Sequence, residues 1–307
     1  MGLPVNYKTL VAARYVIVFL CFWLPPQRRK AVERWLRGHE EYRRLQQADW
    51  VFVSWGKSGR TWLRVMLSRA YQLKTGLSED ELLDFDNFRR QDSSLPAVFF
   101  THNNYLGDYT GVLEPQDQFE GKKVVLLVRD PLDVAVSQYF QWKFRMRPHK
   151  KFINAYPPHG ADVDIWDFVI NKEYGVPRIV DFLNGWARAI PALRDVLVVR
   201  YEDTRKDPER VLAQILDFTG TPVTADEVKA AVEFANYENM KKMEQMKFFR
   251  TSGTRVKPGD ENNPQSFKVR KAKVGGYRDY FTDEQCARLE QMAGGLDPMF
   301  GYRSQPS

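Results

Sequence analysis

The strongest constraint in this sequence is a short apolar run that breaks into a basic, glycine-flanked loop and then resumes as a helical pattern. The stretch covers residues 50–63 and reads WVFVSWGKSGRTWL. Its first half, Val51 to Val53, is typical of a buried strand in a parallel sheet. The loop Gly56 to Gly59 can turn tightly and direct consecutive amides at an anion, and a helix from about Thr61 would add its positive end. The stretch therefore predicts a phosphate-binding loop.

A nucleoside-triphosphate loop is the first alternative for this stretch. Its pattern, G-x-x-x-x-G-K-[ST], is matched in the last three letters by Gly56, Lys57 and Ser58. The first glycine of the pattern would fall at position 51, which is Val51, and the second glycine of the loop follows the lysine instead. A purine triphosphatase is therefore disfavoured. A strand, turn and helix with an incidental lysine remains the structural alternative for this stretch alone.

A second strand-turn-helix unit lies about 70 residues further on. Lys123 to Val128 predicts a buried strand, and Asp130 with Pro131 predicts the N-cap and first position of a helix. Arg129 would then lie at the carboxyl end of the strand, and Ser137 two turns into the helix. These two side chains can approach one phosphate from two directions.

Two further apolar runs predict strands, Ala97 to Thr101 and Val196 to Arg200. Each is followed by a candidate site residue, His102 after the first run and Tyr201 after the second. Open α/β sheets place their sites at the carboxyl ends of such strands. The alternation of strands and helices predicts a three-layer α/β/α domain with a central parallel sheet and a P-loop-like phosphate loop.

Four motifs resemble those of the cytosolic-type sulfotransferases. The 5′-phosphosulfate motif K-S-G-T-T-W matches Lys57–Trp62 except at Arg60, and the 3′-phosphate motif R-x-P-x-D-x-x-x-S matches Arg129–Ser137 letter for letter. The family's Y-E-D segment stands at Tyr201–Asp203. Its R-K-G-x-x-G-x-W element is similar to Arg270–Tyr277, with alanine at the first glycine position and tyrosine near the tryptophan.

The resemblance implies a sulfotransferase that uses 3′-phosphoadenosine 5′-phosphosulfate (PAPS) without a metal. It implies His102 as the general base and Lys57 as the cation at the leaving phosphate; the family's K-T-H element reads Phe100-Thr101-His102 here, so its lysine is lost. Binding of the donor is expected at Lys57, Ser58, Gly59, Arg60, Thr61, Trp62, Arg129, Ser137, Tyr201, Tyr237, Arg270, Lys271 and Ala272. No carboxylate cluster suited to magnesium is evident in the sequence.

The net charge and the cysteine content limit the kinds of ligand and the cellular location that we expect. The net charge of +7 favours anionic ligands or an anionic membrane face, and no nucleic-acid motif accompanies it. The two cysteines predict neither a disulfide framework nor a zinc site, so a cytoplasmic location is expected. Nothing in the sequence indicates an oligomeric state.

The N-terminal segment, residues 1–48, reads as an appendage to a sulfotransferase domain at 49–307. Leu10 to Leu24 is apolar except for Arg14, and two prolines and the basic group Arg28–Lys30 follow it. We expect an interfacial or re-entrant helix at a cytoplasmic membrane face, because a span needs ~20 apolar residues. A buried core helix and a cleaved or spanning segment are the alternatives.

The acceptor is inferred less directly. The expected N-terminal membrane helix favours a lipid headgroup or lipid-linked glycan, and a soluble alcohol or phenol is the alternative. Two other classes stay open: a kinase-like P-loop enzyme, and a non-catalytic membrane-associated protein that binds nucleotide. The basic connection from Phe144 to Asp164 is a candidate lid. Candidate lining residues for the acceptor pocket are Tyr105, Phe140, Trp142 and Trp166.

Overall fold

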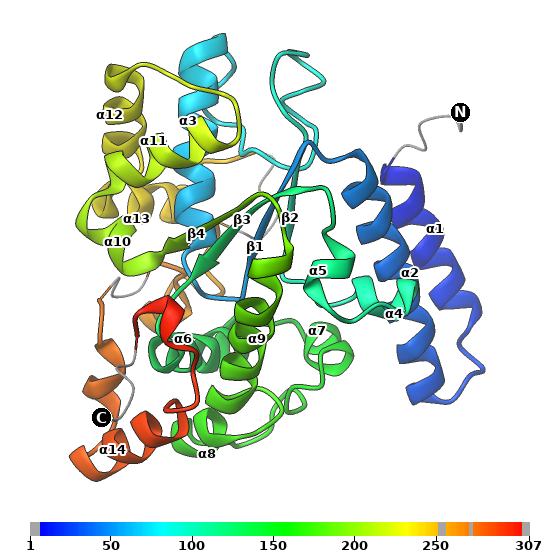
Figure 1. Cartoon of the computed structure of the whole chain (residues 1–307). Coiled ribbons are helices and arrows are strands. Elements are labelled where there is room, and N and C mark those ends of the chain that lie inside the picture. The colour runs from blue at the N-terminus through cyan, green and yellow to red at the C-terminus, as the bar shows by residue number, and fades with distance from the viewer. Residues whose placement is uncertain (1–6, 251–255, 270–272, 303–307) are drawn as a thin grey trace.

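The computed structural model describes residues 7–250, 256–269 and 273–302, which form layers of helices around one sheet (Figure 1). The sheet has four parallel strands in the order β2-β1-β3-β4. Their bounds are Trp50–Ser54 for β1, Val98–Thr101 for β2, Lys123–Val128 for β3 and Val196–Arg200 for β4. All four strands that the sequence predicts are confirmed.

The position of β1 between β2 and β3 decides where a ligand can bind. The chain leaves β1 toward β2 on one side and later returns to β3 on the other, so the connections diverge at the carboxyl end of β1. Val53 pairs in register with both Thr101 and Leu126, which brings the ends of the three strands to one edge. In open α/β sheets such a divergence point is where ligands bind.

Two hydrophobic cores cover the two faces of the sheet. Along β1, Val51 and Val53 enter one core, and Trp50 and Phe52 enter the other, as the two-residue period of a strand requires. The first core packs on α6 (Pro131–Phe144), α8 (Ile165–Ile170), α9 (Val176–Ala189) and α14 (Asp283–Met292). The second packs on α3 (Arg60–Thr75), α11 (Pro208–Phe218), α12 (Ala225–Phe234) and α13 (Tyr237–Gln245). The predicted three-layer α/β/α arrangement is therefore confirmed (Figure 1).

The remaining helices are short or lie at the edge of the sheet. They are α1 (Tyr7–Leu20), α2 (Pro26–Gln47), α4 (Leu106–Thr110), α5 (Pro115–Gln118), α7 (Pro148–Ile153) and α10 (Tyr201–Lys206). Short 3₁₀ segments cover Ile190–Ala192, Pro264–Ser266, Gly276–Tyr280 and Pro298–Phe300. Proline fixes the backbone in the first turn of several helices, and at α6 the predicted cap is confirmed, because Asp130 accepts from the amide of Leu132 at 2.8 Å.

The connection from residue 144 to residue 164 is more ordered than the sequence suggests. It contains α7, which begins at Pro148 and buries Ile153 completely. Lys151 is 2% exposed, and its ammonium lies 4.8 Å from the ring centroid of Trp142. The helix is therefore packed onto α6 through its own side chains, and it contacts α2 on another side.

The two N-terminal helices pack on each other at the edge of the molecule, drawn in blue in Figure 1. Arg14 of α1 is buried and donates to Glu40 of α2 at 2.7 Å. The opposite side of the segment is apolar and open to solvent, with Phe19 74% and Trp23 71% exposed. This segment is therefore not a buried core element. No helix in the described part of the chain combines the length and apolar character needed to cross a bilayer.

One buried carboxylate joins three segments that are far apart in sequence. Glu244 of α13 is 0% exposed and accepts from Arg145 at 2.9 Å. Its two oxygens also accept from the amides of Lys268 at 2.7 Å and Val269 at 3.0 Å. The segment that leads to residue 270 is thereby fixed to the helical layers.

Replacing Glu244 with alanine should lower the free energy of unfolding by ~3–5 kcal/mol, because the change leaves the Arg145 charge buried and two amides without an acceptor. Urea denaturation at pH 7 measures the difference. The exposed Glu209 of α11 supplies a matched control, and Glu209→Ala should change stability by less than ~0.5 kcal/mol. Equal stability of the two variants would contradict the assignment of Glu244 as a buried anchor.

Candidate functional site

A cavity of about 970 Å³ lies at the carboxyl edge of the sheet. Its lining includes residues that follow β1, β2, β3 and β4, namely Lys57, His102, Arg129 and Tyr201. The residues predicted from separate motifs are thus brought to one cavity by the parallel pairing of the strands.

The loop after β1 has the backbone of an anion cradle. Lys57 and Gly59 both lie in the left-handed region, with φ of 73° and 102°. A non-glycine residue in that region is strained by ~1–2 kcal/mol, and such strain concentrates at binding loops. A Cβ atom at Gly59 would lie 2.6 Å from the ring of Tyr201, so only glycine fits there. Gly59 is also the N-cap of α3, whose positive end therefore faces the cavity.

Most of the predicted phosphosulfate loop lines the cavity. Lys57, Gly59, Arg60, Thr61 and Trp62 all contribute to the lining. Ser58 is 2% exposed and is not among the lining residues, so its side chain is turned into the protein.

Arg129 lies where a second anion can be held. Its guanidinium donates to the carbonyls of Lys57 at 3.2 Å and Lys273 at 3.3 Å, and it pairs with Asp133 at 3.4 Å. Ser137 lies two turns further along α6 and also lines the cavity. The loop after β1, the start of α6 and the segment near residue 273 therefore meet around this arginine.

Asp133 fixes that third segment in place. Its carboxylate is 3% exposed and accepts from the amides of Gly275 at 2.9 Å and Tyr277 at 3.0 Å. The three predicted donor-binding residues just before this segment, Arg270, Lys271 and Ala272, lie outside the described residues.

Three aromatic residues predicted to bind the donor, Trp62, Tyr201 and Tyr237, line the cavity. The rings of Trp62 and Tyr201 meet edge to face at 6.3 Å, and the Arg129 guanidinium lies 4.3 Å from the Tyr201 ring centroid. Trp62 Nε1 donates to the carbonyl of Ala235 at 2.7 Å. This bond brings the segment that carries Tyr237 to the cavity wall, where a flat ring system can be enclosed.

His102 is held in one tautomer by its neighbours. Its Nδ1 lies 2.7 Å from the carbonyl of Ser54, so Nδ1 carries the proton and Nε2 offers a lone pair. Arg60 donates to this Nε2 at 2.8 Å and also donates to the carbonyl of Thr101. Burial lowers the pKa of His102 well below its usual value, and the charge of Arg60 lowers it further. The imidazole is therefore neutral at pH 7.

The other end of the cavity contains residues that sequence reasoning missed. Arg34 and Glu41 reach it from α2, and Lys150 reaches it from α7. The sequence signal that could have indicated the role of α2 is Gly38, because a glycine inside a long helix commonly marks close packing against another segment. A Cβ atom there would lie 2.3 Å from the carbonyl of Tyr105, so α4 contacts the α2 backbone directly.

Of the four aromatic residues expected around the acceptor, only Tyr105 is in the lining. Trp142 is 1% exposed in the first core and donates to the carbonyl of Pro157 at 2.9 Å. Phe140 stacks on Phe144, and Trp166 packs edge to face on Phe281. The last three assignments were wrong, because these side chains are engaged with neighbouring helices and loops.

Among the described residues, no group of three or more histidine, cysteine, aspartate or glutamate side chains could hold a metal ion. The cations near the cavity are instead supplied by lysine and arginine side chains, and the loop amides add partial positive charge. This set of groups fits an anionic ligand with two separated phosphate groups.

Comparison with known proteins agrees with this chemistry. A family model described as a sulfotransferase domain matches residues 47–295. Sulfotransferase 2A2 of Rattus norvegicus is 23% identical over 283 residues, covering 84% of this chain and 89% of that protein. Flavonol 3-sulfotransferase of Flaveria bidentis is 26% identical over 266 residues, covering 80% of each protein.

Solved structures show the same fold. Mouse sulfotransferase SULT7A1 complexed with PAP superposes with a TM-score of 0.53 at 22% identity and covers 80% of this chain and 83% of that one. Retinol dehydratase in complex with androsterone and the inactive cofactor PAP superposes with a TM-score of 0.52 at 20% identity, covering 79% and 78%.

Replacing Arg129 with alanine should weaken the binding of adenosine 3′,5′-bisphosphate at least tenfold, because each charge-assisted hydrogen bond contributes ~1.5–3 kcal/mol. Calorimetry without added metal measures the affinity. The exposed Arg188 of α9 provides the control, and Arg188→Ala should bind normally. Unchanged affinity in the Arg129 variant would remove this arginine from the donor site.

Proposed function

Because this chain belongs to the sulfotransferase domain family, we propose that it transfers the sulfuryl group of PAPS to a hydroxyl of an amphiphilic acceptor at a membrane surface. The enzyme would be of the EC 2.8.2 type. The observation that supports this function most directly is the meeting of Lys57, Arg129 and His102 at one cavity. The acceptor class is either a lipid headgroup or a lipid-linked glycan.

The residues of the site suit each requirement of sulfuryl transfer. Charge that develops on the leaving 5′-phosphate is neutralised by Lys57, Arg60 and the amides at the start of α3. Arg129 and Ser137 would hold the 3′-phosphate, and Trp62, Tyr201 and Tyr237 would enclose the adenine. Attacking and leaving oxygens lie roughly in line in the related phosphoryl transfer, and we expect the same geometry here.

His102 would take the proton of the acceptor hydroxyl on Nε2. The lone pair on this nitrogen already receives a hydrogen bond from Arg60, so the acceptor must replace the guanidinium there. An imidazolium beside Arg60 would be unfavourable unless an anion engages the guanidinium. The sulfate of the donor can supply that anion, so donor binding would prepare the base.

The N-terminal helices provide the argument for a membrane surface. Tyr15, Phe19 and Trp23 are exposed on α1 and the turn that follows, and Arg28 is exposed at the start of α2. Aromatic and aliphatic side chains beside basic ones are typical of helices that lie in an interface. We therefore propose that residues 1–48 associate peripherally with a cytoplasmic membrane face and that residues 49–307 form the catalytic domain.

A soluble alcohol or phenol is the second candidate acceptor. Trp55, Phe100, Tyr156 and Phe182 line the cavity and offer apolar contacts for a ring. Labelled-sulfate transfer from PAPS to fractionated lipids, glycans and small phenols separates the two candidates. Tight binding of the bisphosphate with no transfer to any alcohol would instead favour a non-catalytic protein.

Replacing His102 with alanine should lower turnover by ~10²–10⁴-fold while the affinity for the bisphosphate stays nearly constant, because a general base acts on the acceptor. The exposed His159 serves as the control, and His159→Ala should be fully active.

Because the pKa of His102 is lowered, kcat/KM of the unmodified enzyme should stay constant as the pH falls from 8 to ~6.5 and should decline only at lower pH, where the imidazole gains a proton. Near-normal turnover in the His102 variant would assign the base to another residue.

Deleting residues 1–24 should leave only weak binding to vesicles that contain phosphatidylserine and should keep bisphosphate binding intact. The deletion ends before Pro25, the N-cap of α2, so α2 keeps its start and its basic residues. Those residues alone contribute ~1 kcal/mol each at an anionic surface, which gives weak and salt-sensitive attraction. Sedimentation with vesicles measures this.

The double substitution Phe19→Ser and Trp23→Ser is a second test that leaves α1 in place, since it changes only exposed side chains. It should also reduce vesicle binding. Full vesicle binding by either variant, or loss of bisphosphate binding by the double variant, would refute the membrane role.

A further inference from the structure

A carboxylate and an ammonium face the same cavity from two helices without pairing. Glu41 of α2 and Lys150 of α7 both line the cavity, and neither was predicted from the sequence. Both adjoin Tyr105, because Nζ of Lys150 lies 3.5 Å from its hydroxyl and Gly38, one turn before Glu41, meets its carbonyl. No ion pair joins Glu41 and Lys150 among the described residues. A space between opposite charges is thus lined by groups that can bind a polar ligand.

Glu41 has a buried oxygen, Oε2, with no hydrogen-bond partner among the described residues. Burial raises the pKa of this group to about 7. An unpaired buried oxygen of this kind is costly unless a ligand or water satisfies it.

Lys150 likewise keeps donor capacity. Its Nζ lies 3.5 Å from the hydroxyl of Tyr105 and 5.4 Å from the centroid of the same ring, and that hydroxyl donates to Asn154 at 2.8 Å. Burial, together with the charges of Arg37 and Arg14, lowers the pKa of Lys150 to about 8. The ammonium therefore gains from a new acceptor placed beside it.

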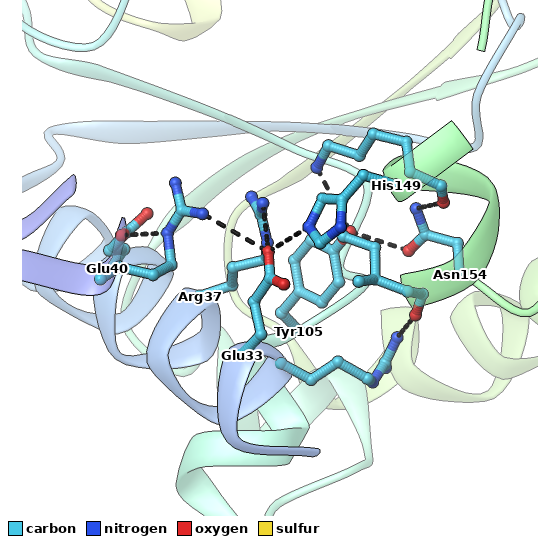
Figure 2. Close-up of polar contacts among 10 residues, drawn as sticks. Glu33, Arg37, Glu40, Tyr105, His149 and Asn154 are labelled. Atoms are coloured by element: carbon cyan, nitrogen blue, oxygen red, sulfur yellow. Dashed lines mark hydrogen bonds and ion pairs between the residues drawn. The ribbon is translucent and has the colours of Figure 1, made fainter. Parts of the chain in front are cut away.

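The two sides of this space are fixed relative to each other by a buried charge network (Figure 2). Glu33 is 3% exposed and accepts from Arg37 at 2.6 Å, from Arg14 at 3.5 Å and from His149 at 2.8 Å. Burial alone would raise the pKa of Glu33, but the hydrogen bonds from His149 and Arg37 outweigh it and lower the pKa. The network joins α1, α2 and α7, and Arg34 adds a bond to the carbonyl of Ile153 at 3.0 Å.

We propose that Glu41 and Lys150 form a subsite that binds the hydroxyl groups of a sugar in the acceptor. The proposal rests on the sulfotransferase function above and narrows its acceptor to a polyhydroxylated headgroup. A hydroxyl can donate to Glu41 and accept from Lys150 at once, and a vicinal pair of hydroxyls can do so from one ring.

Other ligand chemistries fit the space less well. An ammonium would meet the charges of Lys150 and Arg34, and an anionic group would leave Oε2 of Glu41 without a donor. A simple phenol has one hydroxyl, and transfer requires that hydroxyl beside His102, so none is left for the subsite. A sugar offers one hydroxyl to react and others to bind.

The test compares labelled-sulfate transfer from PAPS to n-octyl β-glucoside, below its micellar concentration, and to n-octanol. Glu41→Gln and Lys150→Met should each lower the ratio of kcat/KM for the glucoside to that for octanol by tenfold or more. Glu209→Gln and Lys229→Met, at exposed positions of α11 and α12, should leave the ratio unchanged. A ratio that stays within twofold in both subsite variants would overturn the proposal.

Two further arms remove ambiguity. Free glucose as acceptor shows whether the subsite serves soluble sugars, and sulfation that falls in the subsite variants supports it there too. If the unmodified protein sulfates no alcohol, the proposed function fails, and calorimetry of octyl glucoside with the bisphosphate complex then tests the subsite alone. Weaker glucoside binding in both subsite variants supports it, and binding that is equal or absent in all proteins refutes it.

Discussion

The parallel pairing of β1 with both β2 and β3 is the constraint on which the site depends. It aligns Val53 with Thr101 and Leu126, so the loops that follow the three strands begin at one edge. The phosphate loop, His102 and Arg129 come from segments separated by some 45 and 27 residues of sequence. Without this register they would not share a cavity, because no disulfide joins them and none is available from the two free cysteines.

Two sequence departures from the family pattern lie close to His102, at Phe100 and at Arg60. The lysine of the K-T-H element is replaced by Phe100, whose ring lies 3.7 Å from the guanidinium of Arg64. Arg60 stands where the phosphosulfate motif has threonine, and its guanidinium reaches Thr101 and His102. A cation therefore lies beside the histidine in this chain, and it comes from α3. The planar guanidinium of Arg60 differs from a lysine ammonium, because its separate nitrogens donate to two fixed acceptors at once.

The parts of the molecule that were predictable from sequence are governed by local rules. Buried strands show continuous apolar runs. The N-cap of α6 was predictable from Asp130 and the proline that follows it. The placement of His102 and Arg129 followed from their position just after strands. The contribution of Glu41 did not, because it depends on how α2 packs on α4, which are separated by about 60 residues. The aromatic residues Phe140 and Trp142 were misplaced because sequence spacing does not say which neighbour a helix face meets.

The helix contact at Gly38 means that the width of the cavity can be altered from a position outside its lining. The missing side chain of Gly38 lets the carbonyl of Tyr105 approach the α2 backbone, one turn before Glu41. A methyl group at residue 38 must move α4 away, and the wall of the cavity between Arg34 and Glu41 must move with it. Relatives with a larger residue here would have a cavity of different width even if every lining side chain were the same. On the proposed function, the spacing of two helices would thus influence substrate range independently of the chemistry of the lining.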